Sequence, residues 1–224
     1  MQGLTALITR EIKTEWRNRN VIAGLLLYSF SSILLVYFLL YYSSTSGEPL
    51  PALARTMIFW LILLFSAVNA VSGSFFREQD GHFMYHYYTL SPEKYLISKF
   101  IVNAFIGGLL TIFSVLIFEL LIPGSIFRPE LYLAVLLLGT LAFSSLFTVM
   151  SSLAARAGTN TGMVTIIGFP VVIPLLIYIA RLTIAALEKT QSEHLIGRDL
   201  LILLAFNLIL PILGLVLFPY IWRE

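Results

Sequence analysis

Long uninterrupted apolar runs dominate the hydrophobic pattern of this chain. Six of them are about 20 residues long, which is the length that a helix rising about 1.5 Å per residue needs to cross a hydrocarbon core of about 30 Å. They cover Val21–Tyr42, Thr56–Phe75, Lys99–Ile122, Leu131–Ala154, Met163–Ala180 and Leu200–Trp222. A membrane β-barrel would instead show short strands of alternating polarity. The pattern therefore predicts an all-α membrane protein with six transmembrane helices.

The first 20 residues carry a different pattern, that of an amphipathic helix. Apolar residues recur there at spacings of three and four, at Leu4, Leu7, Ile8, Ile12 and Trp16. Polar and basic residues fall on the other face, at Arg10, Lys13, Thr14 and Arg17. We expect residues 1–20 to lie as a helix in the headgroup plane, before one six-helix domain of residues 21–224. The alternative is a solvent-exposed leader.

Composition and charge agree with a membrane location and give an orientation. Hydrophobic residues make up 58% of the chain and charged residues 12%, too little polar surface for a soluble protein of this size. With a cytoplasmic N-terminus, nine basic residues face the cytoplasm: Arg10, Lys13, Arg17, Arg19, Arg77, Lys94, Lys99, Arg156 and Arg223. Five face outward: Arg55, Arg128, Arg181, Lys189 and Arg198. The excess of basic residues inside predicts that both termini are cytoplasmic. Because the basic residues are dispersed, no nucleic-acid partner is expected.

The longest cytoplasmic connection, residues 76–98, has an unusual arrangement of turn and helix-capping residues. Asp80-Gly81 marks a turn, and Ser91-Pro92 is typical of a helix cap followed by a first helical turn. Between them lies a stretch rich in aromatic residues, which includes Phe83, Tyr85, Tyr87 and Tyr88. Such residues contribute much of the binding energy at protein interfaces, which suggests a docking element for a partner protein. A belt of tyrosines resting in the headgroup layer is an equally good interpretation.

Polar residues recur in stripes along several predicted spans. Span two carries Ser66, Asn69 and Gly73, span three carries Asn103, Gly107, Thr111 and Ser114, and span four carries Thr140, Ser144, Thr148 and Ser151. Small and hydroxylated residues favour close helix packing, which is the preferred interpretation. The alternative is a polar translocation path through Asn69, Asn103, Thr111, Glu119 and Thr140. Glu119 is included because a carboxylate near membrane depth is a functional candidate, although it lies close enough to the outer boundary to reach water.

Span five is the most irregular of the six. Pro170 and Pro174 stand four residues apart, so two backbone hydrogen bonds are lost and the helix should kink or break. A further apolar stretch follows from Arg181 to Leu187. We expect a bent helix followed by a partial re-entry into the membrane from the outer side.

The sequence lacks the motifs that carry common enzymatic chemistry. It has no cysteine, no glycine-rich phosphate loop, no nucleophile elbow and no zinc-binding H-E-x-x-H motif. His82 and His86 have a spacing that could place both on one metal or haem iron, but without further ligands nearby a partner-facing or interfacial role is preferred. An intramembrane enzyme or a secondary transporter should show a nucleophile and base, or several buried charges at mid-membrane. We therefore expect a chain that is not an enzyme and has no metal site.

Several motifs of this chain resemble those of a known family. In the second loop these are Phe76-Arg77-Glu78-x-Asp80-Gly81, then Leu90-Ser91-Pro92 and Lys99; further on come Leu138-Gly139-Thr140 and Arg156-x-Gly158. The most specific motif is the Phe169-Pro170-x-x-Ile173-Pro174-Leu175-Leu176-Ile177 run in span five. Together they resemble the haem exporter protein B, or CcmB, family, the membrane subunit of the cytochrome c maturation ABC transporter within the ABC-2 permeases. The resemblance covers most of the chain.

This resemblance implies an ABC-2 type architecture and a set of partners. They are a cytoplasmic ABC ATPase, a second copy of the chain, a haem-handling membrane protein and a small single-helix protein, all in a bacterial inner membrane. ATP would bind the ATPase, and haem would be at most cargo of the complex, because no cofactor is expected to bind this chain firmly.

The resemblance also implies roles for particular residues. The ATPase-coupling loop would comprise Arg77, Glu78, Asp80, Gly81, Phe83, Tyr85, Tyr87, Ser91 and Pro92, and the kinked span five would involve Arg156, Gly158, Pro170 and Pro174. The function implied is haem export, or ATP-driven release of a haem-loaded chaperone. The alternative is an ABC-2 permease that exports a drug, a lipid or a polysaccharide.

Overall fold

The protein folds as a bundle of long helices. The computed structural model describes residues 2–43, 50–76, 92–156, 161–189 and 192–222. In this part of the chain the helices are α1 (Gln2–Arg17), α2 (Arg19–Ser43), α3 (Ala52–Phe76), α5 (Pro92–Leu121), α6 (Pro129–Arg156), α7 (Thr161–Leu187) and α8 (Glu193–Trp222). Six of the described helices, α2 to α8, are long and apolar enough to cross a membrane. The predicted fold class, an all-α protein with six membrane spans, is thereby confirmed.

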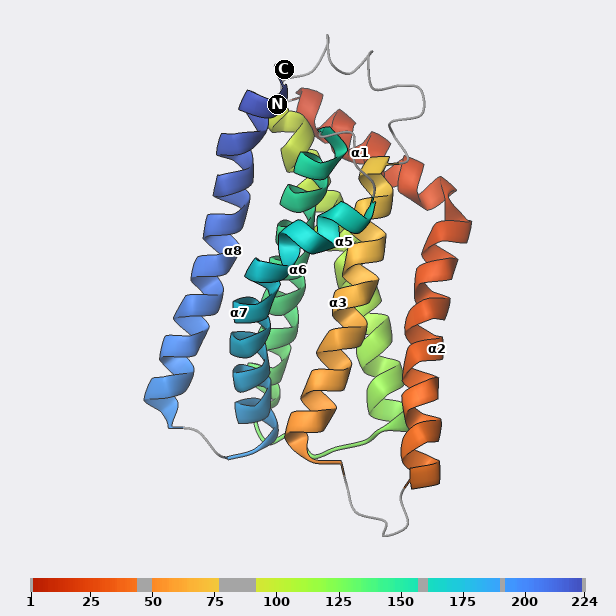
Figure 1. The fold of residues 1–224 in the computed structure, drawn as a ribbon, viewed down its shortest axis with the longest axis vertical. Coiled ribbons are helices and arrows are strands. Elements are labelled where there is room, and N and C mark those ends of the chain that lie inside the picture. The colour runs from red at the N-terminus through yellow and green to blue at the C-terminus, as the bar shows by residue number, and fades with distance from the viewer. Residues whose placement is uncertain (1, 44–49, 77–91, 157–160, 190–191, 223–224) are drawn as a thin grey trace.

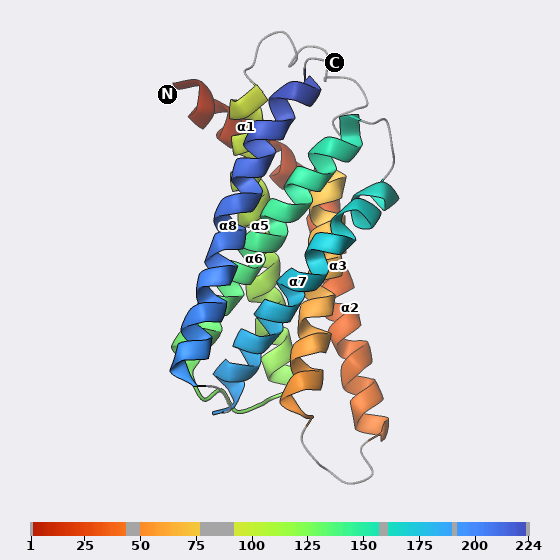
Figure 2. The same cartoon turned by 60° about the vertical axis from the view of Figure 1, so that its left-hand side comes forward.

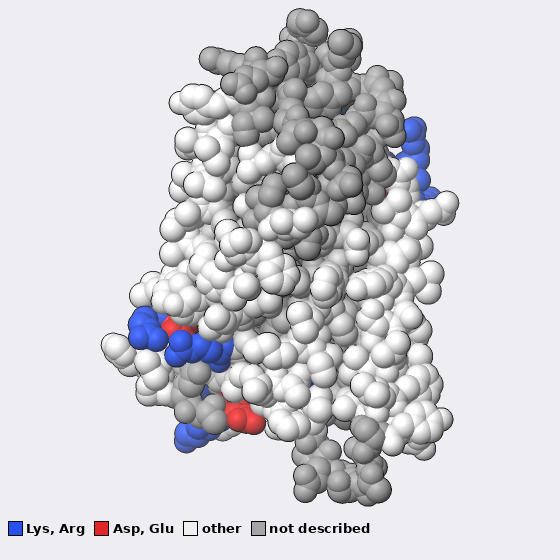
Figure 3. Space-filling view, in the orientation of Figure 1, with Lys and Arg blue, Asp and Glu red and all other residues white. Residues whose placement is uncertain are grey.

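The six spans run side by side, and α1 lies obliquely across the end of the bundle at which the chain begins and finishes (Figures 1 and 2). Helix α6 occupies the centre, because it contacts α3, α5, α7 and α8. Helices α2 and α8 lie at opposite sides of the bundle (Figure 1). On the face seen in Figure 3, the charged side chains lie towards the two ends, and the white surface between them is uncharged. This distribution is what a hydrocarbon environment requires of a membrane-spanning bundle.

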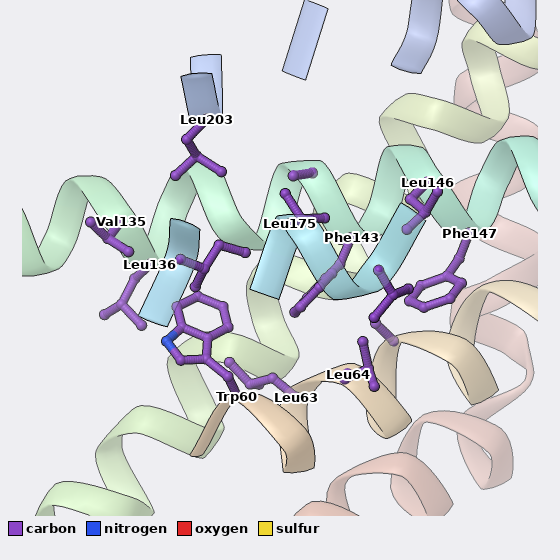
Figure 4. Close-up of a cluster of buried hydrophobic side chains, with 14 of the residues drawn as sticks. Trp60, Leu63, Leu64, Val135, Leu136, Phe143, Leu146, Phe147, Leu175 and Leu203 are labelled. Atoms are coloured by element: carbon purple, nitrogen blue, oxygen red, sulfur yellow. The ribbon is translucent and has the colours of Figure 1, made fainter. Parts of the chain in front are cut away.

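The core is centred on Trp60 of α3, whose side chain is fully buried among residues of several helices (Figure 4). The ring of Phe143 meets the indole edge-on, with centroids 5.8 Å apart. The indole Nε1 donates a hydrogen bond to Thr183 Oγ1 on α7, at 2.9 Å. Gly139 of α6 lies against the six-membered part of the indole, where a Cβ atom would overlap it. The position of the Trp60 ring is therefore set by a polar contact at one edge and by a glycine at another.

Helices α5 and α6 approach closely at Gly107. A Cβ atom added to this glycine would lie 2.6 Å from Ser144 Oγ and 3.3 Å from Thr140 Cγ2. In lipid no hydrophobic force drives two apolar helices together, so close backbone approach and van der Waals contact provide much of their association. The neighbouring Gly108 faces open space and has no such role.

Helix α7 differs in part from the sequence-based expectation. It contains Pro170 and Pro174 but continues without a break from Thr161 to Leu187. A bend is visible in its upper part in Figure 1, whereas α8, which also contains two prolines, shows no comparable bend. The predicted re-entry from Arg181 to Leu187 is wrong, because these residues form the last turns of the same helix. Their backbone groups are satisfied by helical hydrogen bonds, so no turn back into the membrane is needed.

The first prediction compares the two adjacent glycines of α5. Gly107→Val should lower the stability of the purified protein by about 1 to 3 kcal/mol, because the new side chain overlaps Ser144 and Thr140. Gly108→Val is the matched control, with open space at the same depth of the same helix. Thermal unfolding in detergent measures both variants. Equal melting temperatures for the two would contradict the close packing of α5 on α6.

Candidate functional site

The predicted coupling loop lies mostly outside the described residues. This holds for Arg77, Glu78, Asp80, Gly81, Phe83, Tyr85, Tyr87 and Ser91, and also for Gly158. The loop's attachment points are described: α3 ends at Phe76, and α5 begins at Pro92, as the Ser91-Pro92 pattern predicts. Both points lie at the end of the bundle that carries α1 (Figure 1). Arg156, from the predicted span-five group, is the last residue of α6 and lies outside span five.

A buried ion pair joins α1 to the start of α5. Lys99, in the second turn of α5, is 1% exposed, and its Nζ lies 2.8 Å from Glu11 Oε2 on α1. A lysine at this depth is stable because its charge is matched by a carboxylate at hydrogen-bonding distance. The sequence analysis placed Lys99 among the cytoplasmic basic residues and missed its partner. The signal was present as an acidic residue among the apolar positions of residues 1–20.

The same contact extends to the last helix. Lys99 Nζ lies 5.6 Å from the centroid of the Tyr95 ring, and that ring stacks on Phe218 of α8 with centroids 6.1 Å apart. Cation and ring attract each other most strongly when both are shielded from water. The first turns of α5, directly after the predicted coupling loop, are thus in contact with both α1 and α8.

The two faces of α1 are not simply one apolar face and one basic face. Leu7 is buried against the bundle, but so are the carboxylate-bearing side chains of Glu11 and Glu15. Trp16, which was expected to lie on the apolar face, is 58% exposed. The inward face of α1 therefore combines apolar and acidic residues. The location of α1 in the headgroup plane stays a prediction.

The α5–α6 interface contains three of the five residues proposed for a polar path. Asn103 Nδ2 donates to Thr148 Oγ1 at 3.0 Å, and the hydroxyl groups of Thr111 and Thr140 lie 2.7 Å apart. Beside them is a small cavity with room for about one water molecule, lined by residues that include Ser66 of α3. This arrangement matches helix packing through paired polar groups, which was the preferred interpretation.

The two remaining polar-path residues lie elsewhere. Asn69 is exposed on the outer surface of α3, and its Nδ2 donates to Phe65 O in its own helix at 3.0 Å. Glu119 lies near the opposite end of α5, where it pairs with Arg55 and accepts a hydrogen bond of 2.9 Å from the Tyr132 hydroxyl. The Arg55 guanidinium occupies space beside Gly124, where a Cβ atom would overlap it. Glu119 thus serves to join α3, α5 and α6 at that end of the bundle.

The Leu138-Gly139-Thr140 motif makes contacts with three neighbours of α6. Leu138 O accepts a hydrogen bond from Asn207 Nδ2 of α8 at 3.1 Å. Gly139 makes room for the Trp60 ring of α3, and Thr140 bonds to Thr111 of α5. Three consecutive residues on a helix face three different directions, so a central helix can use them for three different partners.

Among the described residues, no group of three or more His, Cys, Asp or Glu side chains could hold a metal ion. In the described part of the chain, charged and hydroxyl side chains form buried ion pairs and hydroxyl contacts that join helices.

The chain matches the model of a known family over essentially its whole length. The model of the family described as CcmB protein matches residues 2–220. A comparison with curated proteins finds no match. The family match extends over α1, all six spans and the connections between them.

The second prediction concerns the buried pair of α1 and α5. Lys99→Met should destabilise the protein by about 3 kcal/mol, because Glu11 then stays buried without this cation. Adding Glu11→Gln should cost less than the sum of the two single changes, since both remove the same interaction. Lys94→Met is the control, because Lys94 is exposed on the same helix. Thermal unfolding of the four variants measures the effect, and additive losses would show that the pair contributes nothing.

Proposed function

The chain belongs to the CcmB protein family, the haem-exporter membrane permeases of cytochrome c maturation, and we propose that it works as the permease subunit of an ATP-driven complex in the bacterial inner membrane. The family match over residues 2–220 is the observation that carries this proposal. It favours cytochrome c maturation over an ABC-2 permease for a drug, a lipid or a polysaccharide. Six membrane spans in a single bundle fit the role of a permease.

The proposed complex places both termini of the chain in the cytoplasm. The nine-to-five excess of Lys and Arg on that side supports this orientation. A separate ABC ATPase would dock there, on the connection between α3 and α5. A second copy of the chain, a haem-handling membrane protein and a small single-helix protein would complete the assembly.

The contacts at the start of α5 suggest how ATPase movement reaches the spans. The coupling connection leads directly into α5 at Pro92. Within two turns, α5 is tied to α1 through Lys99 and Glu11 and to α8 through Tyr95 and Phe218. Because packed helices move as rigid bodies, a push on the connection would shift these three helices together.

Haem enters this proposal as cargo of the complex. The chain would either conduct haem or convert ATP-driven movement into release of a haem-loaded chaperone on the outer face. The described residues support the second role better, because polar side chains at the α5–α6 contact are paired with each other, as at Asn103 with Thr148 and Thr111 with Thr140. A polar path would need such groups to be open to a solute.

Our third prediction tests the docking of the ATPase. Tyr85→Ala with Tyr87→Ala should reduce copurification of the ATPase about tenfold or more, because aromatic residues at the centre of an interface carry much of its binding energy. Tyr41→Ala with Tyr42→Ala is the matched control. These tyrosines are 68% and 82% exposed, and they lie near the end of α2 that is far from the coupling connection. Equal copurification of both double variants, with unchanged ATP-dependent activity, would refute the coupling role.

Our fourth prediction tests the bend in α7. Pro170→Ala with Pro174→Ala should straighten the helix, because each change restores a backbone hydrogen bond and alanine is the better helix former. The double variant is expected to insert and assemble but to leave c-type cytochromes immature in cells with no other copy. Haem staining of c-type cytochromes provides the measurement. The control is Pro211→Ala with Pro219→Ala in α8; normal cytochromes from a well-expressed α7 variant would mean that the bend has no mechanistic role.

A further inference from the structure

Two arginines share one buried carboxylate where α7 and α8 lie together. Asp199, in the second turn of α8, is fully buried. Its Oδ2 lies 3.2 Å from Arg181 Nε on α7, and its Oδ1 lies 3.3 Å from Arg198 Nη2. Two positive charges therefore surround one negative charge, and the cluster carries one positive charge in excess.

The two arginine side chains are partly exposed, although the carboxylate that they pair with is fully buried. Their side chains are 40% and 52% accessible, whereas Asp199 has no accessible surface. Arg181 on its own would neutralise Asp199. Each guanidinium has five N–H donors in a planar fork. Within the described part of the chain, Asp199 is the ionic partner of both arginines, and one carboxylate can accept from only a few of their N–H donors.

The depth of this cluster is unusual for charged groups. Arg181 precedes the end of α7 by six residues, and Arg198 follows the start of α8 by five, both within helices that span the membrane. At about 1.5 Å per residue, they lie about 7 to 9 Å inside the helix ends. Long basic side chains at such a depth extend towards the headgroups. Figure 3 shows basic and acidic side chains together at this end of the molecule, below a surface without charge.

The surroundings of the cluster are apolar and open to lipid. One helical turn deeper in the membrane, Ile177 on α7 is 49% exposed and Leu201 on α8 is 68% exposed. A ligand that fits this surface therefore has an anionic head, to meet the arginines, and an apolar chain, to cover Ile177 and Leu201. Phosphate suits the planar fork of arginine because it accepts two parallel hydrogen bonds.

We propose that Arg181 and Arg198, held in place by Asp199, form a binding site for the phosphate group of an anionic phospholipid, whose acyl chain lies along α7 and α8. Asp199 acts as a positioning residue, because its buried carboxylate lies 3.2 Å from one guanidinium and 3.3 Å from the other. The excess positive charge favours a lipid with a net negative head over a zwitterionic one. This site is independent of the transport role proposed above.

The test uses the purified full-length protein in detergent, titrated with phosphatidylglycerol or phosphatidylcholine, with bound lipids counted by native mass spectrometry. Arg198→Gln removes the excess charge but leaves Asp199 paired with Arg181. It should weaken phosphatidylglycerol retention about tenfold, the loss expected for one charge-assisted hydrogen-bonding group. Lys189→Gln, at an exposed basic residue of the same end, is the matched control and should retain the lipid as the unmodified protein does.

Other outcomes would overturn the proposal. Equal retention in Arg198→Gln and Lys189→Gln would show that Arg198 has no specific role. Displacement of the lipid by an equal concentration of inorganic phosphate would identify a site for a free anion. A shift of Arg198→Gln from dimer to monomer, with lipid retention unchanged, would assign the arginines to a contact between copies. Arg198→Lys keeps the charge and should retain more lipid than Arg198→Gln; an equal loss in both would attribute the effect to damaged packing.

Discussion

Hydrocarbon cannot hydrogen-bond to a polypeptide, and this constraint shapes every part of the bundle. Each span must satisfy its backbone groups within its own helix, which accounts for six long helices in the described chain. The same constraint explains why α7 stays helical through Pro170 and Pro174, where a soluble protein could break the chain. A bend that leaves two carbonyl groups without helical partners costs less than a break that would expose many more.

Because lipid is as apolar as leucine, the hydrophobic effect does not select which helices pack together. The selection comes from shape and from a few polar pairs. At Gly107 the backbones of α5 and α6 come close enough for Thr111 to bond to Thr140 and Asn103 to Thr148. At Gly139 a missing side chain admits the Trp60 ring, whose Nε1 bonds to Thr183. These contacts give the central helix α6 its neighbours.

Charged residues add a second kind of contact, because ion pairs join neighbouring helices at each end of the bundle. Lys99 and Glu11 join α5 to α1 at one end, while Arg55 with Glu119 and Arg181 with Asp199 join helices near the other. An ion pair shielded from water is sensitive to the loss of either partner. Movement of α1 and α5 relative to each other is therefore constrained where the proposed ATPase would act, which is the property a coupling element needs.

The number of spans, their helical nature and the start of α5 at Pro92 could all be predicted from the sequence, because run length and helix-capping residues are local properties. The family resemblance was also available from local motifs such as the span-five prolines. The partners of the buried charges could not be predicted. Glu11 and Lys99 are 88 residues apart in the chain. The position of Glu11 among apolar residues is a local signal, but nothing local shows which distant cation meets it. The re-entry expected after Arg181 was wrong for the same reason, since the guanidinium is accommodated by Asp199 from the next helix. Local hydrophobicity determines that a segment is a membrane helix, but the cost of burying a charge depends on which distant residue meets it, and only the tertiary structure decides that.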